Sequence, residues 1–306
     1  MNNLELLWGV GSMVLVGAGW TVFGYLMGKA PKEGIDVTGL LFICTGIEFL
    51  CSGIIACIMG IPQAALSGWL IGFGVLVLCG IVNYFQLEFM SKAMQKGPNG
   101  IIWTVTQSGF IFPFAVGIIF FGVPLGWVRG VAFLLIITSL IMFGGKDEKN
   151  GNFGNWKFTA LLAFLATGVC QILSNLPSYF PEADSIPSMW RTAAFALGLL
   201  FGCILVRIRQ LRNFSGLIIG QLKNHKVWRM AALGGFSNLI FSFLFLYPGM
   251  NILADIDAGA IAYPVMVCSC LIIFEFYSVI FLHEKRSAMQ IVALLLCLCG
   301  VAGICL

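Results

Sequence analysis

Charge is scarce in this sequence. Charged residues make up 10% of the 306 positions and hydrophobic residues 59%, and the mean hydropathy is +0.98. Soluble domains carry about 25% charged residues, so this composition excludes a soluble globular protein. The longest polar stretches, Gly145 to Trp156 and Arg207 to Lys226, are too short to build a core of their own. The chain is therefore predicted to be an all-α polytopic membrane protein.

Motifs for enzymatic or ATP-driven chemistry are also missing from the sequence. There is no Walker-type phosphate-binding loop, so ATP-driven transport would need a separate subunit. There are two histidines and no CxxC zinc spacing, and the eleven cysteines fall in apolar runs, where we expect them to serve as packing residues. We therefore expect no cofactor, no metal and no enzymatic activity, and the sequence gives no support to nucleic-acid binding.

Apolar runs of the length needed to cross a bilayer, about 20 residues, dominate the chain instead. Ten are predicted: Leu6 to Gly28, Asp36 to Gly60, Trp69 to Met90, Pro98 to Phe121, Leu125 to Gly144, Phe158 to Pro177, Met189 to Val206, Trp228 to Tyr247, Gly259 to Leu282 and Ala288 to Leu306. They divide the chain into a first five-helix repeat (residues 1–145), a cytoplasmic linker (146–156) and a second five-helix repeat (157–306).

Basic residues are distributed unequally between the two ends of these helices. Of the seventeen lysines and arginines, all but Arg129 and Arg191 fall in the connections that follow odd-numbered helices. Because lysine and arginine are retained on the cytoplasmic side, both termini are expected to be extracytoplasmic. We expect an integral protein of a bacterial cytoplasmic membrane, monomeric or homodimeric.

The two sets of five helices share a weak internal echo. Gly100 opens the fourth predicted helix as Gly259 opens the ninth, and Pro113 and Pro264 follow inside them. An odd number of helices in each set makes the two sets antiparallel in the membrane. The sequence thus predicts two inverted five-helix repeats.

The turn Leu282-His283-Glu284, followed by an apolar helix, resembles the turns of the drug/metabolite transporter superfamily in its ten-helix, EamA-type branch. The first half departs from this pattern, because Val123 stands where the family has glutamate. The segments Gly80 to Tyr84 and Lys96 to Gly100 are faintly similar to rhamnose-type sugar permeases of the same superfamily. The resemblance implies a pocket between the halves, lined by the first four helices of each, with the fifth and tenth helices at the periphery.

Three carboxylates lie inside predicted spans and are candidates for proton coupling. Glu48 lies near the middle of the second span with apolar flanks, where an ionisable group indicates function. The alternative for Glu48 is a neutral, structural carboxyl. Glu88 precedes Lys92 by one helical turn, which favours a local ion pair. Glu275 lies in the inner third of the ninth span, and Glu284 is expected to fix a helix end.

Neutral polar and aromatic residues recur on several spans and predict the pocket wall. Pairs four residues apart share a helix face, as Gln171 and Asn175 do. The predicted substrate-binding residues are Trp20, Glu48, Asn83, Trp103, Gln107, Gln171, Asn175, Asn238 and Tyr263. Interhelical hydrogen bonds that hold the bundle together are the alternative for each of the polar ones.

These features favour a secondary active transporter that moves a small polar metabolite, a sugar, amino acid or amine, by alternating access coupled to protons. A passive exchanger or facilitator would share the architecture and differ in energetics. A membrane-embedded enzyme would need clustered His, Asp or Ser residues at depth, which the sequence does not contain. Within one superfamily the fold does not settle the substrate.

Overall fold

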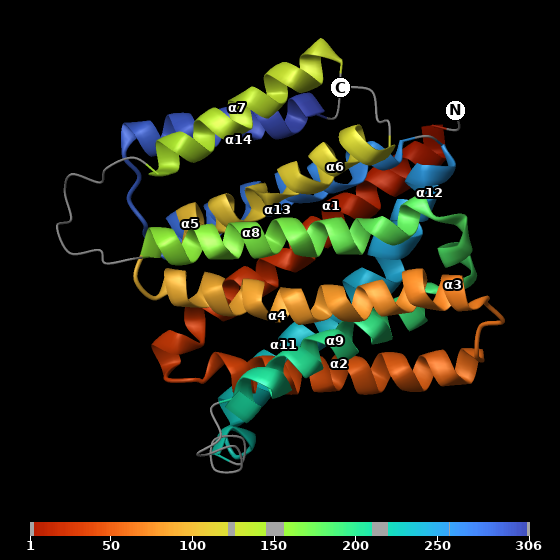
Figure 1. The fold of residues 1–306 in the computed structure, drawn as a ribbon. Coiled ribbons are helices and arrows are strands. Elements are labelled where there is room, and N and C mark those ends of the chain that lie inside the picture. The colour runs from red at the N-terminus through yellow and green to blue at the C-terminus, as the bar shows by residue number, and fades with distance from the viewer. Residues whose placement is uncertain (1–2, 122–125, 145–155, 210–219, 257, 305–306) are drawn as a thin grey trace.

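Long apolar helices lie side by side along most of the chain in the computed structural model (Figure 1). The structure describes residues 3–121, 126–144, 156–209, 220–256 and 258–304. Within these ranges every regular element is helical. A bilayer requires this, because backbone groups in hydrocarbon must be hydrogen-bonded internally. The predicted all-α polytopic fold class is confirmed at this level.

The first half contains seven α-helices joined by short turns. Their bounds are α1 Asn3–Lys29, α2 Val37–Met59, α3 Leu66–Trp69, α4 Val75–Met94, α5 Asn99–Gln107, α6 Ile111–Phe121 and α7 Trp127–Gly144. A π-helical turn at Leu70–Gly74 joins α3 to α4, and a 3-10 turn at Ser108–Phe110 joins α5 to α6. Each of these pairs therefore forms one continuous rod.

The second half also consists of helices joined by turns. Its helices are α8 Trp156–Asn175, α9 Ser188–Arg209, α11 His225–Ile240, α12 Tyr247–Asp255, α13 Ala262–Ile280 and α14 Ala288–Ile304. A π-helical turn at Phe241–Leu246 joins α11 to α12, and the 3-10 turns Leu176–Tyr179, Pro181–Ser185 and Gly259–Ile261 occupy connections.

Eight of the described helical rods are long and apolar enough to cross a membrane. Two further apolar helices, Trp127–Met142 within α7 and Ala288–Gly303 within α14, are shorter. These two helices pack along each other at one edge of the bundle (Figure 1). The peripheral position matches the one expected for the fifth and tenth helices. Of the predicted linker, only Trp156 is described, and residues 146–155 lie outside the described ranges, as does Val123.

The eighth predicted span is longer than the sequence indicated. Its predicted end is Tyr247, directly before Pro248, and proline removes a backbone hydrogen bond from a regular helix. The structure instead continues to Asp255. The π-helical turn at Phe241–Leu246 ends just before the proline, and the wider turn accommodates the lost hydrogen bond.

Glycines allow the closest helix approaches in the bundle. A Cβ on Gly198 of α9 would collide with the backbone carbonyl of Val77 on α4, and one on Gly80 of α4 would collide with the carbonyl of Phe195. A Cβ on Gly235 of α11 would lie 2.6 Å from the carbonyl of Cys44 on α2. Small residues are the usual means of close packing between membrane helices.

The ends of the bundle differ in charge. Glu33, after α1, forms ion pairs with Lys29 and with Lys226 at the start of α11, both at 3.6 Å. Gly97, after α4, packs against Trp156 at the start of α8. These contacts involve residues in or beside four of the predicted basic connections. We call this end of the bundle the basic end. The first turn of α1 and the last of α14 lie at the opposite end (Figure 1).

Candidate functional site

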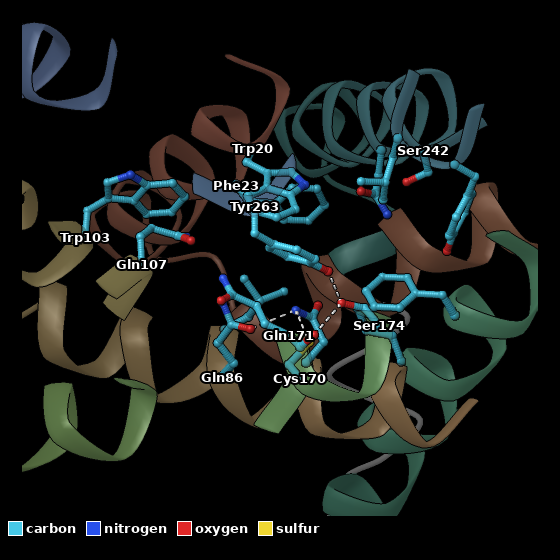
Figure 2. Close-up of a pocket in the computed structure, with 17 residues that line it drawn as sticks. Trp20, Phe23, Gln86, Trp103, Gln107, Cys170, Gln171, Ser174, Ser242 and Tyr263 are labelled. Carbon is cyan, nitrogen blue, oxygen red and sulfur yellow. Dashed lines mark hydrogen bonds between the residues drawn. The ribbon is translucent and has the colours of Figure 1, made fainter. Parts of the chain in front are cut away.

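A pocket of about 100 Å³ lies among the helices of both halves (Figure 2). Its wall is formed by residues of α1, α4, α5, α8, α9, α11, α12 and α13 and of the π-helical turn before α12. The lining residues are Trp20, Phe23, Asn83, Gln86, Leu87, Trp103, Gln107, Cys170, Gln171, Ser174, Phe195, Leu199, Asn238, Ser242, Leu246, Tyr247 and Tyr263. None of these seventeen described side chains is charged at neutral pH.

Seven of the nine residues predicted to bind substrate line this pocket. They are Trp20, Asn83, Trp103, Gln107, Gln171, Asn238 and Tyr263. These residues lie on six different helices, and the fold brings them to one place. The other two, Glu48 and Asn175, lie next to the pocket rather than in its wall.

Glu48 sits directly behind the pocket wall. Its side chain is 1% exposed, and its Oε1 accepts a hydrogen bond of 2.7 Å from Nδ2 of Asn238, which does line the pocket. The close approach of Gly235 to Cys44 places α11 against α2, so Asn238 and Glu48, each about one turn farther along, face each other. Glu48 is therefore connected to the pocket by its hydrogen bond with the side-chain amide of Asn238.

Several buried polar atoms around the pocket have no protein partner. Oε1 of Gln107 and Oε1 of Gln171 make no hydrogen bond within the described residues, and neither does Oε2 of Glu48. An unpaired buried group costs about 1–3 kcal/mol, so each of these atoms favours water or a ligand. The side chain of Gln107 extends toward the middle of the pocket in Figure 2.

Aromatic rings complete the wall. The rings of Trp20 and Tyr263 are 6.4 Å apart between centroids and tilted by 47°. Trp103 stacks on Phe274 at 4.8 Å with an angle of 26° between the planes. The hydroxyl groups of Tyr263 and Ser174 share a hydrogen bond, drawn as a dashed line in Figure 2. This bond ties α13 to α8 at the pocket surface.

A second polar group of the wall lies where α4 meets α8. Nδ2 of Asn83 donates to Oε1 of Gln86 at 3.0 Å, and Sγ of Cys170 lies 3.7 Å from the same nitrogen. The thiols of Cys170 and Cys79 are 3.5 Å apart. The side-chain amide of Asn83 thus already has a hydrogen-bond partner within the protein, whereas the side-chain oxygens of Gln107 and Gln171 have none among the described residues.

Asn175 lines a smaller pocket of about 30 Å³ that shares Tyr263 with the larger one. Its neighbours there include Phe110, Pro113 and Tyr179. The smaller pocket has room for about one or two water molecules, so it is too small for a metabolite in this structure. Tyr263 stands between the two spaces.

The other predicted carboxylates are engaged in ion pairs away from the pocket. Glu88 accepts from Nζ of Lys92 at 2.6 Å, as the spacing indicated. Glu275 pairs with Arg286 at 3.1 Å. Neither carboxylate lines the larger pocket. Groups of three or more possible metal ligands are absent from the described residues.

Several pocket residues were not among those predicted from the sequence. A local signal existed for Gln86, three residues after Asn83, and for Ser174, three after Gln171, because such spacings share a helix face. Phe195 and Leu199 carry no such signal. Ordinary apolar residues of a buried helix become pocket residues only through the packing of α9 on α4.

Together, the fold and the pocket define a class: an all-α, polytopic membrane protein with an uncharged pocket of mixed polar and apolar lining inside its helical bundle. No family model matches the chain, and no curated protein is found to match it. Its fold is similar to that of a known structure described only as "Crystal structure of protein", with a TM-score of 0.58 and 15% identity. The similarity covers 96% of this chain and 96% of that chain, and it concerns the fold alone.

Proposed function

We propose that this protein is a secondary active transporter that moves a small, uncharged polar metabolite across the membrane by alternating access. The observation that carries the proposal is the pocket itself, which is uncharged, amide-lined and aromatic, and is built from both halves of the chain. A site near the centre, between two structural repeats, is typical of secondary transporters.

The pattern of helix contacts supports two inverted five-helix repeats. If the two halves are interchanged, the packing of α1 on α13 corresponds to the packing of α8 on α5 and α6. Contacts of α4 with α9 have a counterpart in those of α11 with α2, and contacts of α4 with α8 in those of α11 and α12 with α1. When the two halves are interchanged, the contact of α7 with α14 and the contact of α2 with α9 each correspond to themselves. Such symmetry lets two halves rock against each other around a fixed site.

The chemistry of the wall favours a hydroxyl-rich neutral solute. A charged ammonium or carboxylate in the pocket would find no opposite charge among the lining residues, and leaving it unpaired away from water is costly. Hydroxyl groups both donate and accept, so they can pair with the free oxygens of Gln107 and Gln171. Aromatic faces suit the apolar faces of a sugar ring. Among the predicted classes, sugars therefore fit better than amines or amino acids.

Coupling to protons is proposed to run through Glu48. It is buried, has one free oxygen and contacts the pocket residue Asn238. A change in its protonation would alter which groups Asn238 can bond, and so the pocket wall. The basic end is proposed to face the cytoplasm of a bacterial cell, which leaves both termini outside.

Uptake into proteoliposomes tests this function. A panel of radiolabelled monosaccharides, neutral amino acids and amines would be offered with and without an imposed pH gradient. The proposal predicts gradient-driven accumulation of a neutral sugar. Counterflow of the same sugar without any ion dependence would support the alternative, a passive exchanger. The absence of both accumulation and counterflow for all three sets would contradict both.

A further inference from the structure

Glu284 caps a helix that begins 185 residues earlier in the chain. Its Oε1 accepts from the backbone N–H of Asn99 at 2.6 Å, and its Oε2 accepts from that of Gly100 at 3.1 Å. These are the first N–H groups of α5, which lack partners inside the helix. The positive end of the helix dipole also favours a carboxylate at this position. The connection between α13 and α14 is therefore fastened to the start of α5 at the basic end.

Arg286 joins this cap to α13. One guanidinium nitrogen, Nη2, donates to Glu284 at 2.9 Å, to Glu275 at 3.1 Å and to the hydroxyl of Ser278 at 2.7 Å. Only 8% of the Arg286 side chain is exposed. Removing one member of so buried a network leaves its partners unpaired, which is strongly unfavourable. The four side chains therefore act as one unit.

The backbone is adapted to this unit in two places. A Cβ on Gly100 would lie 2.6 Å from the hydroxyl of Ser278 and 2.7 Å from Oε1 of Glu275, so only glycine leaves room for the network. His283, with φ of 52°, lies in the left-handed region, which non-glycine residues seldom occupy. α13 ends at Ile280, and the left-handed turn at His283 comes directly before Glu284, which reaches the start of α5. Strain of this kind persists where surrounding contacts require it.

The unit lies one helical turn from the pocket wall along α5. Trp103 follows the capped residues by one turn of α5, stacks on Phe274 of α13, and lines the pocket. Gln107 follows by another turn. Trp103 and Phe274 are 1% and 0% exposed, and Trp103 precedes Gln107 on α5, so their buried stack lies on the side of the pocket nearer the start of α5.

We propose that Glu284, Arg286, Glu275 and Ser278 form a latch that holds α5 against α13, positions Trp103 and Gln107 in the pocket wall, and closes the pocket at the basic end. At the corresponding place in the predicted first repeat the sequence has Val123, whose side chain cannot accept a hydrogen bond. In the transport cycle of the proposed function, opening toward the basic end releases α5 from Glu284. The positioning role itself does not depend on transport.

Labelling of Cys170 tests the latch directly. Cys170 lines the pocket, and in a chain whose other ten cysteines are replaced it reports access to the pocket. An impermeant methanethiosulfonate reagent is applied to the basic side of oriented proteoliposomes. Glu284→Ala and Arg286→Ala should each raise the labelling rate about tenfold, because each breaks hydrogen bonds to a charged group and shifts the population toward the open form. Lys285→Ala, an exposed neighbour, should leave the rate unchanged.

A second pair of variants protects the test against simple misfolding. His283→Gly relaxes the left-handed turn without moving Glu284 and should label at the parental rate, whereas His283→Val should label faster because β-branched residues are strained there. Glu284→Gln, which keeps an acceptor but loses the charge, should give an intermediate rate. Parental labelling rates in Glu284→Ala and Arg286→Ala would overturn the proposal. The labelling needs no solute, so its result is independent of whether uptake is found.

Discussion

Asn238 of α11 donates a hydrogen bond of 2.7 Å to Glu48 of α2, and the other carboxylate oxygen of Glu48 is unpaired. The amide thus separates the buried carboxyl from a pocket whose wall has no charge of its own. In the proposed function, this pair connects the proton-coupling carboxyl to the solute-binding residues. The pair lies between one helix of each half, so rocking of the halves would change its geometry.

Replacing Glu48 by glutamine tests coupling without disturbing the contact. Glutamine still accepts the hydrogen bond from Asn238, so the fold should be retained. The glutamine side chain has no titratable group, so it cannot carry a proton. We expect solute accumulation in proteoliposomes to lose its dependence on the pH gradient, while counterflow continues. Glu88→Gln is the matched control, because Glu88 pairs with Lys92 outside the pocket. Full gradient dependence in the Glu48→Gln variant would rule out the role of Glu48.

Removing the hydroxyl of Tyr263 should weaken solute binding. Tyr263→Phe breaks the bond to Ser174 and leaves the ring next to Trp20 in place. A neutral hydrogen bond contributes about 0.5–1.5 kcal/mol, which corresponds to a loss of roughly two- to tenfold in affinity. Affinity would be measured by ligand-dependent tryptophan fluorescence. Tyr277→Phe, on the same helix and outside the pocket, serves as control, and equal effects of both variants would contradict the assignment.

Adding one methyl group to Gly198 should destabilise the bundle. Gly198→Ala forces α9 away from the carbonyl of Val77, and overpacking of this kind typically costs about 1–3 kcal/mol. The thermal unfolding midpoint in detergent should fall. Gly53→Ala is the matched control, because nothing lies within 4 Å of the added Cβ there. That variant should unfold at the same temperature or slightly higher, since alanine is the better helix former.

Much of the fold follows from hydrophobic pattern alone, because a run of about 20 apolar residues has few alternatives to a spanning helix. The pattern could not show that the helix at 225–255 passes Pro248, since the accommodating π-helical turn is set by packing. Polar residues inside apolar runs pointed to seven pocket residues. Phe195 and Leu199 gave no signal, and although Glu284 was expected to fix a helix end, the sequence did not indicate that this end is the start of α5. Both depend on contacts between residues far apart in the chain.

The central claim is that the neutral pocket binds an uncharged polar solute, and a thermal-shift screen of the purified protein tests it most directly. Three matched sets would be compared: monosaccharides, neutral amino acids and alkylamines. The account predicts stabilisation by one or more monosaccharides, lost in Gln171→Leu and retained in Gln95→Leu, whose glutamine is exposed at the end of α4. Stabilisation confined to amines or amino acids, or unaffected by Gln171→Leu, would contradict it.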